Sequence, residues 1–229
     1  MSPPAPTFTT TLIPPPGKST PLNLPIFPTP TTPTSSGVPL TDALIIRSLV
    51  FINEQNCTPE GEIDNDDARS WQWVIYHEPQ PSATTPVSPT ESKIPVAVIR
   101  LVPPPHEPHE ALTHPESAGS LPKWDTEHEP YVKLTRVAVL KEWRGYGLGR
   151  TLVEEALEWA RGHAEEIERA YAEVAGEKEK EWKGLVLVHA QTQVERMYAR
   201  MGFETDEGLG RWDEEGIEHV GMWRRVQLS

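Results

Sequence analysis

A glycine-rich turn between an apolar strand and an amphipathic helix constrains this chain more than any other feature. Residues 134–140 are mostly β-branched or aliphatic, which is typical of a buried strand. The turn, residues 144–150, reads Arg-Gly-Tyr-Gly-Leu-Gly-Arg. Apolar residues then recur at helical spacing, at Leu148, Leu152, Val153, Ala156, Leu157 and Ala160. The pattern predicts a strand that runs through this turn directly into a helix.

The composition of the turn favours anion binding. Glycine has no Cβ, so backbone N–H groups at alternate positions can approach an anion closely. The first-turn amides of the helix favour negative charge at the same point, and Arg144 and Arg150 add positive charge. A dinucleotide fingerprint would need glycine in place of Arg150, and a nucleotide-triphosphate loop would need Gly-Lys-Ser/Thr. The turn therefore predicts a diphosphate-binding cradle that is neither of these two known loops. The alternative is a turn that binds no ligand.

The arrangement R-G-x-G-x-G after a V-A-V strand resembles the GNAT superfamily of acetyl-CoA-dependent N-acetyltransferases. This resemblance implies an α/β fold with a central, mostly antiparallel, partly splayed sheet flanked by helices. It also implies that acetyl-CoA is the co-substrate, with its amide-bearing arm paired to the strand before the cradle like an added strand. The cofactor-binding residues that it implies are Ala138, Val139, Leu140, Arg144, Gly145, Tyr146, Gly147, Leu148, Gly149 and Arg150.

Two further segments carry the resemblance. Residues 47–55, RSLVFINEQ, resemble the V-F-x-x-E-Q signature of a GNAT subgroup, which implies that Glu54 lies near the acceptor amine. Residues 191–203, QTQVERMYARMGF, resemble the last-helix motif of the family and imply that Tyr198 lies near the sulfur of CoA. Gln191 precedes Tyr198 by seven residues, about two helical turns, so both are expected to face the cofactor. The alternatives are a solvated helix end for Glu54 and a core aromatic for Tyr198.

Acyl transfer from a thioester to an amine needs a base that removes a proton from the amine and a donor that stabilises the departing thiolate. Tyr198 is the candidate donor to the departing thiolate, whose pKa resembles that of cysteine, about 8.5. Glu54, His189 and His219 are candidate bases or water-positioning residues, although His189 follows a predicted buried strand and is equally suited to a structural role. His219 lies in GIEHVGMW, which resembles the terminal strand of the same subgroup, and is a candidate substrate-binding residue. Cys57 is the only thiol for a double displacement and lacks basic neighbours, so direct transfer is favoured.

The proline distribution indicates the domain organisation. All 25 prolines precede Tyr131, and they predict an extension over residues 1–40 and flexible insertions at 78–93 and 103–130, the second of which is also a possible lid. The N-acetyltransferase domain is expected to span residues 41–229, with a possible first strand at 8–13. Thr41 or Asp42 is expected to cap the first helix. Other strands are expected at 70–77, 94–102 and 185–189, from 203 and at 217–226, and helical patterns at 148–174 and 191–201.

Two polar clusters invite a metal interpretation that their spacing does not favour. The acidic segment at residues 62–67 lacks the glycine and glutamate positions of a calcium loop, so a solvated turn is predicted. The four histidines of residues 103–130 follow no zinc-ligand pattern. No metal is therefore expected.

The formal charge of −13 argues against nucleic acid as a partner and favours a cationic amine. No apolar segment is long enough to span a membrane, and no secretory signal is recognisable. One cysteine fits a reducing compartment, so a cytoplasmic location is expected, with the nucleus not excluded. A homodimer is compatible with the pattern but not required by it.

The leading hypothesis is transfer of acetyl from acetyl-CoA directly to a primary amine of a small molecule, such as the amino sugar glucosamine or a polyamine. Acetylation of a protein or peptide at a lysine or N-terminus is the second hypothesis. A non-catalytic CoA-binding sensor or interaction module is the third.

Overall fold

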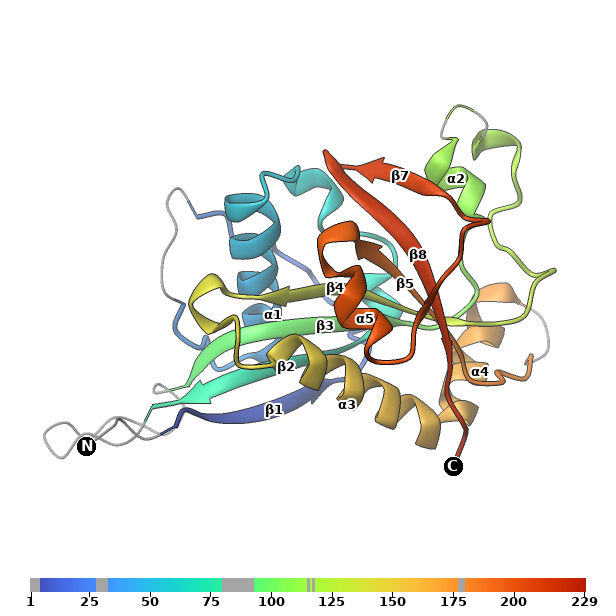
Figure 1. Cartoon of the computed structure of the whole chain (residues 1–229). Helices are drawn as coiled ribbons and strands as arrows, with labels where there is room; N and C mark the ends of the chain where they lie inside the picture. Colours follow the sequence, from blue (N-terminus) through green and yellow to red (C-terminus); the bar gives the residue numbers. More distant parts are fainter. Residues whose placement is uncertain (1–4, 28–32, 80–92, 115, 117, 177–179) are drawn as a thin grey trace, which may run out of the picture. The chain divides into compact units, whose positions relative to one another are not determined.

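The computed structural model describes residues 5–27, 33–79, 93–114, 116, 118–176 and 180–229 (Figure 1). The chain divides into two compact units, residues 1–100 with 136–153 and residues 101–135 with 154–229. Strands β3 (Ile94–Val102) and β4 (Val132–Val139) and helix α3 (Leu148–Gly162) contribute residues to both units. Most of the predicted flexible insertion at 78–93 lies outside the described residues.

The first unit contains the start of the sheet, in the hydrogen-bonded order β1-β2-β3-β4. Its predicted strands are confirmed, including the first strand, which pairs antiparallel with the second from Thr7↔Glu78 to Ile13↔Gln72. The remaining elements of this unit are β1 (Thr7–Ile13), α1 (Pro39–Arg47), η1 (Ser48–Glu54), η2 (Pro59–Gly61), η3 (Asp67–Arg69), β2 (Trp71–Glu78) and η5 (Lys141–Trp143).

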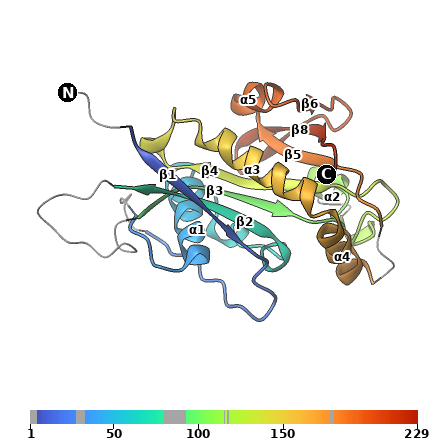
Figure 2. The ribbon, with the colours of Figure 1, turned by 90° about the horizontal axis from the view of Figure 1, so that it is seen from below.

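Helix α1 lies beside β2 and β3, where its apolar face closes a core (Figure 2). The members of this core are Ile13, Ala43, Ile46, Leu49, Val50, Val74, Tyr76, Val98, Ala138 and Leu140. Strand β3 is apolar except at Arg100 and is buried at every position but the first, and β2 is buried from Trp71 to Tyr76.

The start of α1 differs from the prediction that Thr41 or Asp42 caps it. Val38 is the N-cap and Pro39 the first helical residue, where proline's missing N–H costs nothing. The Asp42 carboxylate instead accepts hydrogen bonds from the Ser36 N–H at 2.6 Å and the Tyr76 hydroxyl at 3.0 Å. Asp42 therefore ties the helix to the preceding loop and to β2 from inside the first turn.

The second unit contains the rest of the sheet, in the order β4-β5-β8-β6, with β7 also paired to β8. Strand β4 runs parallel to β5 over three residue pairs, Val132↔Val186 to Leu134↔Val188. The pairs that β8 forms with β5, β6 and β7 are all antiparallel. The remaining elements of this unit are α2 (His109–Thr113), η4 (Ala118–Ser120), α4 (Ala164–Ala175), β5 (Leu185–Gln191), η6 (Thr192–Val194), α5 (Glu195–Ala199), β6 (Glu204–Thr205), β7 (Arg211–Glu214) and β8 (Ile217–Arg225).

Two helical predictions need correction in their extent. The pattern expected to run through residues 148–174 is two helices, because His163 leaves helical geometry at φ −131° and ψ 36° between α3 and α4. The helix expected over 191–201 is only α5, since β5 continues to Gln191 and a 3₁₀ turn follows it. Gly202 ends this region at φ 80°, where the Phe203 N–H donates to the Tyr198 carbonyl at 3.1 Å.

Much of the insertion at 103–130 has a defined structure. His106 is buried, stacks on Tyr131 and has its Nε2 atom 2.9 Å from the Tyr131 carbonyl. Within the described residues, no helix has the length and apolar character needed to cross a membrane.

Candidate active site

The glycine-rich turn adopts a backbone that ordinary residues avoid. Gly145 and Gly147 have φ values of 88° and 79°, in the left-handed region that favours glycine. A Cβ added at either residue would meet no atom within 4 Å, so both face open space. Helix α3 then begins at Leu148, and its first i→i−4 bond joins the Thr151 N–H to the Gly147 carbonyl at 3.1 Å.

This geometry is suited to a diphosphate. Helical geometry gives the Leu148 and Gly149 amides no i→i−4 acceptor, so they lie at the positive end of α3. An anion near this end gains about 0.3–1 kcal/mol per charge from the helix dipole. The open surface over Gly145 and Gly147 leaves room for such a ligand, so the residues present fit the pyrophosphate of CoA.

Aromatic side chains support the turn from the N-terminal strand. Trp143 packs against His77 with ring centroids 4.4 Å apart, and Phe8 of β1 contacts Trp143 edge-on at 5.8 Å. Tyr146 lies 5.9 Å from Phe8 and keeps 54% of its surface exposed. The predicted first strand therefore contributes directly to positioning the cradle.

The polar backbone groups at the end of strand β4 point in two different directions. The Leu140 N–H donates to the Val96 carbonyl of β3 at 2.9 Å, so this amide is already occupied. Because N–H and C=O groups alternate in direction along an antiparallel pair, those of Val139 point away from β3. Its carbonyl accepts a bond from Arg144 Nε at 3.0 Å. Of the three predicted strand residues, Val139 is thus the one whose polar backbone groups face away from the neighbouring strand.

Glu54 lies at the cradle, bound to one of its arginines. It is the last residue of η1, a π-helix, and its two carboxylate oxygens accept bonds from Arg144 Nη1 and Nη2 at 2.6 and 2.7 Å. Both side chains are partly exposed. The structure therefore brings Glu54, which is predicted from one motif, together with Arg144 and Val139, which are predicted from another.

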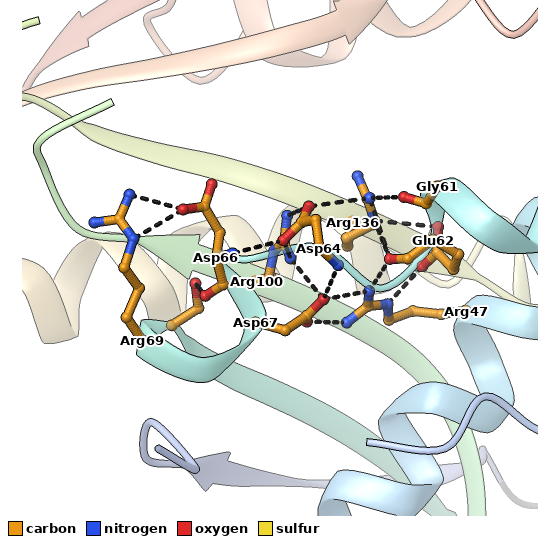
Figure 3. Close-up of polar contacts among 10 residues, drawn as sticks. Arg47, Gly61, Glu62, Asp64, Asp66, Asp67, Arg69, Arg100 and Arg136 are labelled. Carbon is orange, nitrogen blue, oxygen red and sulfur yellow. Dashed lines mark hydrogen bonds and ion pairs between the residues drawn. The ribbon is translucent and has the colours of Figure 1, made fainter. Parts of the chain in front are cut away.

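The acidic segment before β2 is not the solvated turn that the sequence predicts. Figure 3 shows its carboxylates bound to Arg47 of α1, Arg100 of β3 and Arg136 of β4, and Asp66 bound to Arg69. Arg47 is fully buried and binds Glu62 at 2.6 Å and Asp67 at 2.5 Å. Arg100, 2% exposed, binds both oxygens of Asp64 at 2.7 and 2.8 Å.

The pKa values within this network follow from its pairing. Burial raises the pKa of Asp67, but hydrogen bonds and charges from Arg47 and Arg100 outweigh burial and hold it well below its usual range. The pKa of Asp64 is lowered in the same way, with Arg100 as the main opposing partner of burial. Both carboxylates are therefore ionised at neutral pH, and the network is a structural one.

A strained residue links this network to β4. Arg136 has a φ of 51°, which is rare for a residue other than glycine and locally kinks a strand. Its guanidinium donates to the Gly61 carbonyl at 3.0 Å and lies 3.1 Å from a Glu62 oxygen. The kink lies two residues after the last parallel pair of β4 with β5.

The second unit contains a cluster of rings around the buried Trp212 of β7. Its centroid lies 4.8 Å from those of His189 and His109 and 6.2 Å from that of His219. His189 Nε2, His109 Nδ1 and Trp212 Nε1 are buried without a hydrogen-bond partner among the described residues. The structure thus brings His189 and His219, two predicted site residues, next to the same indole.

Burial governs the chemistry of His189. It lowers the pKa of His189 well below the ordinary value of 6.5, with further lowering from Lys133, His109 and His219. His189 is consequently neutral at pH 7, and its conjugate acid is too strong for it to be an effective base toward an ammonium group. The His219 imidazole is buried and donates from Nδ1 to the Ile217 carbonyl at 2.8 Å.

Within the described residues, no group of three or more metal-ligating side chains could hold a metal ion.

Tyr198 is a buried residue of α5, and Gln191 does not share a helix with it. The expected spacing of two helical turns is wrong, because Gln191 is the last residue of β5, where it pairs with His219. Tyr198 is 3% exposed and packs edge-on against Phe203, with ring centroids 5.6 Å apart. Burial raises its pKa well above the usual value, so its hydroxyl stays protonated at every physiological pH.

Comparison with known proteins identifies the family of the chain. The model of the acetyltransferase (GNAT) family matches residues 50–203, well over half of the chain. The chain belongs to the acetyltransferase (GNAT) family. As a family member it is an acyl-CoA-dependent N-acetyltransferase, with the open, mostly antiparallel sheet flanked by helices that such enzymes share.

Three known proteins are similar to this chain. The uncharacterized protein YyaT of Bacillus subtilis (strain 168) is 28% identical over 195 residues, covering 83% of this chain and 91% of the relative. The crystal structure of a proposed N-acetyltransferase from Lactobacillus plantarum matches with a TM-score of 0.53 at 19% identity, over 95% of this chain and 97% of the other. FeeM, an N-acyl amino acid synthase from uncultured soil microbes, matches with a TM-score of 0.53 at 9% identity, over 96% and 91%. At these identities the two structures show the fold alone.

Sequence reasoning missed the arginines of the buried network. Arg47, Arg100 and Arg136 each interrupt an apolar run, at a helix or strand position where a charge needs a buried partner. Three such arginines and one acidic segment are a signal for a buried ion-pair network.

Proposed function

We propose that this enzyme transfers the acetyl group of acetyl-CoA directly to a primary amine of a small molecule, an amino sugar such as glucosamine or a polyamine. The observation that carries the proposal is the pair of left-handed glycines, Gly145 and Gly147, at the start of α3. Backbone amides of residues 145–149 would hold the pyrophosphate, with Arg150 adding positive charge. When bound, acetyl-CoA supplies an acetyl group already activated as a thioester.

Two groups of the chain are suited to the acyl side of the reaction. The Val139 N–H, directed away from β3, would donate to the thioester carbonyl oxygen and stabilise the charge that develops there. The Tyr198 hydroxyl would donate to the leaving sulfur, as the resemblance of the last-helix motif implies. Because burial raises the pKa of Tyr198, we expect a hydrogen bond to the thiolate rather than complete proton transfer.

Glu54 is suited to the amine side. A lysine-like amine is mostly protonated at pH 7, and its free base lies about 4 kcal/mol uphill. A carboxylate beside the cradle would bind the ammonium form and orient it for proton loss to water. The formal charge of −13 supports a cationic acceptor. We propose His219 as a further substrate-binding residue, whereas the lowered pKa of His189 makes it a weak candidate for the base.

A thiol-release assay with acetyl-CoA and an amine panel tests this proposal. The panel contains glucosamine, spermidine, free amino acids and lysine or N-terminal peptides, each at the same concentration. Release of CoA with glucosamine or spermidine, at least about tenfold faster than with the peptides, supports the proposal. Faster release with peptides would instead identify a protein acetyltransferase, and CoA binding without release would identify a sensor.

A further inference from the structure

The guanidinium of Arg144 has a partner within the chain at each of its three nitrogens. Its Nη1 and Nη2 atoms form a fork on the two oxygens of Glu54, at 2.6 and 2.7 Å. Its Nε atom donates to the Val139 carbonyl at 3.0 Å. One planar group therefore joins a carboxylate from the end of η1 to the end of β4.

This pairing conflicts with a simple phosphate-binding role for the Arg144 side chain. A pyrophosphate that bound this guanidinium bidentately would have to displace the Glu54 carboxylate from Nη1 and Nη2, or the Val139 carbonyl from Nε. The backbone conformation of the cradle, in contrast, is determined by the glycines and by the start of α3. It does not depend on the Arg144 side chain. The two roles of residue 144, backbone and side chain, are thus separable.

The surroundings of Glu54 also indicate a fixed carboxylate. Glu54 ends a π-helix, a form that is rare and often found at functional sites. The preceding residue is anchored, because the Asn53 amide donates to the Phe27 carbonyl at 2.8 Å. The fork from Arg144 then restricts the carboxylate itself. A carboxylate offers about four lone-pair sites, so one held by two N–H groups can still accept from an ammonium group.

We propose that Arg144 is a positioning residue, whose side chain fixes the Glu54 carboxylate beside Val139 to receive the acceptor amine and does not bind the pyrophosphate. This inference rests on the proposed role of Glu54 in binding the amine. One planar guanidinium therefore holds both the amine-binding carboxylate and the Val139 carbonyl at the end of β4. Lysine cannot replace that fork, because a single ammonium group keeps the charge but not the planar, two-pronged geometry.

The decisive variant is Arg144→Lys, which keeps the net charge of the cradle. We expect its dissociation constant for CoA, measured by calorimetry, to stay within about twofold of the wild type. Its kcat/KM for the amine should fall about tenfold, because the carboxylate is no longer held in one orientation. Arg150→Gln provides the contrast: it should weaken CoA binding and leave the KM for the amine nearly unchanged. The exposed Arg144–Glu54 pair adds little to folding, so circular dichroism should show an intact fold in each variant.

A double-mutant cycle with Glu54→Gln separates positioning from a general structural effect. Arg144→Lys should lower kcat/KM for the amine in the wild type and have no further effect in Glu54→Gln, because the group that it orients is absent. A tenfold loss of CoA affinity in Arg144→Lys, or an amine kcat/KM equal to the wild type, would overturn the inference. So would an equal effect of Arg144→Lys in both backgrounds. A wild-type chain that fails to bind CoA contradicts the proposed function itself, whereas these outcomes contradict only the role of Arg144.

Discussion

Arg136 reaches from a kinked position in β4 to Glu62, with 3.1 Å between Nε and the carboxylate oxygen. The left-handed φ of Arg136 costs on the order of 1–3 kcal/mol, and it persists only where surrounding contacts hold it. Those contacts come from the acidic segment, which Arg47 and Arg100 fix in turn. The buried ion pairs therefore stabilise the kinked conformation of β4, the strand that leads into the cradle.

Breaking this network should destabilise the fold strongly. Asp67→Asn removes a fully buried carboxylate and leaves Arg47 and Arg100 without a charged partner there. We expect a loss of about 3–5 kcal/mol in the free energy of unfolding, measured by urea denaturation. The matched control is Asp66→Asn, whose partner Arg69 lies nearer the surface, with an expected loss below about 1 kcal/mol. Equal losses in the two variants would refute a structural role for the network.

Stability should fall in acid because of the same carboxylates. The folded-state pKa values of Asp64 and Asp67 lie below those of the unfolded chain, so their stabilisation is complete above the unfolded value of about 4. It is lost as the pH falls from there toward the folded-state values. Urea midpoints measured between pH 7 and pH 3 should be nearly constant above about pH 5 and decline below it. In Asp67→Asn that decline should be shallower, and an unchanged slope would show that other groups cause it.

The cradle glycines should be needed for cofactor binding rather than for folding. Gly147→Ala adds a Cβ where φ is 79° and nothing lies within 4 Å, so it strains the backbone by about 1–2 kcal/mol without a clash. Gly176→Ala, at φ 67° after α4, carries a similar strain in equally open space. Both variants should melt at similarly reduced temperatures. Only Gly147→Ala should weaken CoA binding, by about tenfold in calorimetry, and equal CoA affinities would argue against the cradle.

Tyr198 should affect turnover rather than cofactor binding. Tyr198→Phe keeps the ring packed on Phe203 and removes only the hydroxyl, so we expect kcat to fall about 10–100-fold with CoA affinity unchanged. Tyr171→Phe is the matched control. Its buried hydroxyl has no partner within the described part of the chain, so its removal should leave kcat unaltered. Loss of CoA affinity in Tyr198→Phe would instead indicate a packing role.

Local sequence patterns predict the strands and the cradle, because a short stretch of consecutive residues determines each of these elements. The apolar run at 94–102 is β3 as predicted, and the alternate glycines before Leu148 need no distant contact to define their turn. The resemblance to the family, carried by these local motifs, is confirmed by the match over residues 50–203.

Features that depend on distant partners could not be predicted in this way. The acidic segment reads as a solvated turn until Arg47, Arg100 and Arg136 are brought against it from three separate elements. Likewise, helical spacing alone could not reveal that Gln191 continues β5, because its pairing with His219 is a tertiary contact. The pairing of Glu54 with Arg144 joins residues 90 positions apart in sequence.

The central claim is that the backbone between Arg144 and Arg150 holds the pyrophosphate of CoA. Calorimetric titration of CoA into the 229-residue chain tests it most directly, with adenosine as the ligand that lacks the diphosphate. The account predicts saturable one-to-one association with CoA, with a dissociation constant on the order of micromolar to millimolar, and much weaker association with adenosine. No saturable heat with CoA, or equal affinity for adenosine, would contradict it.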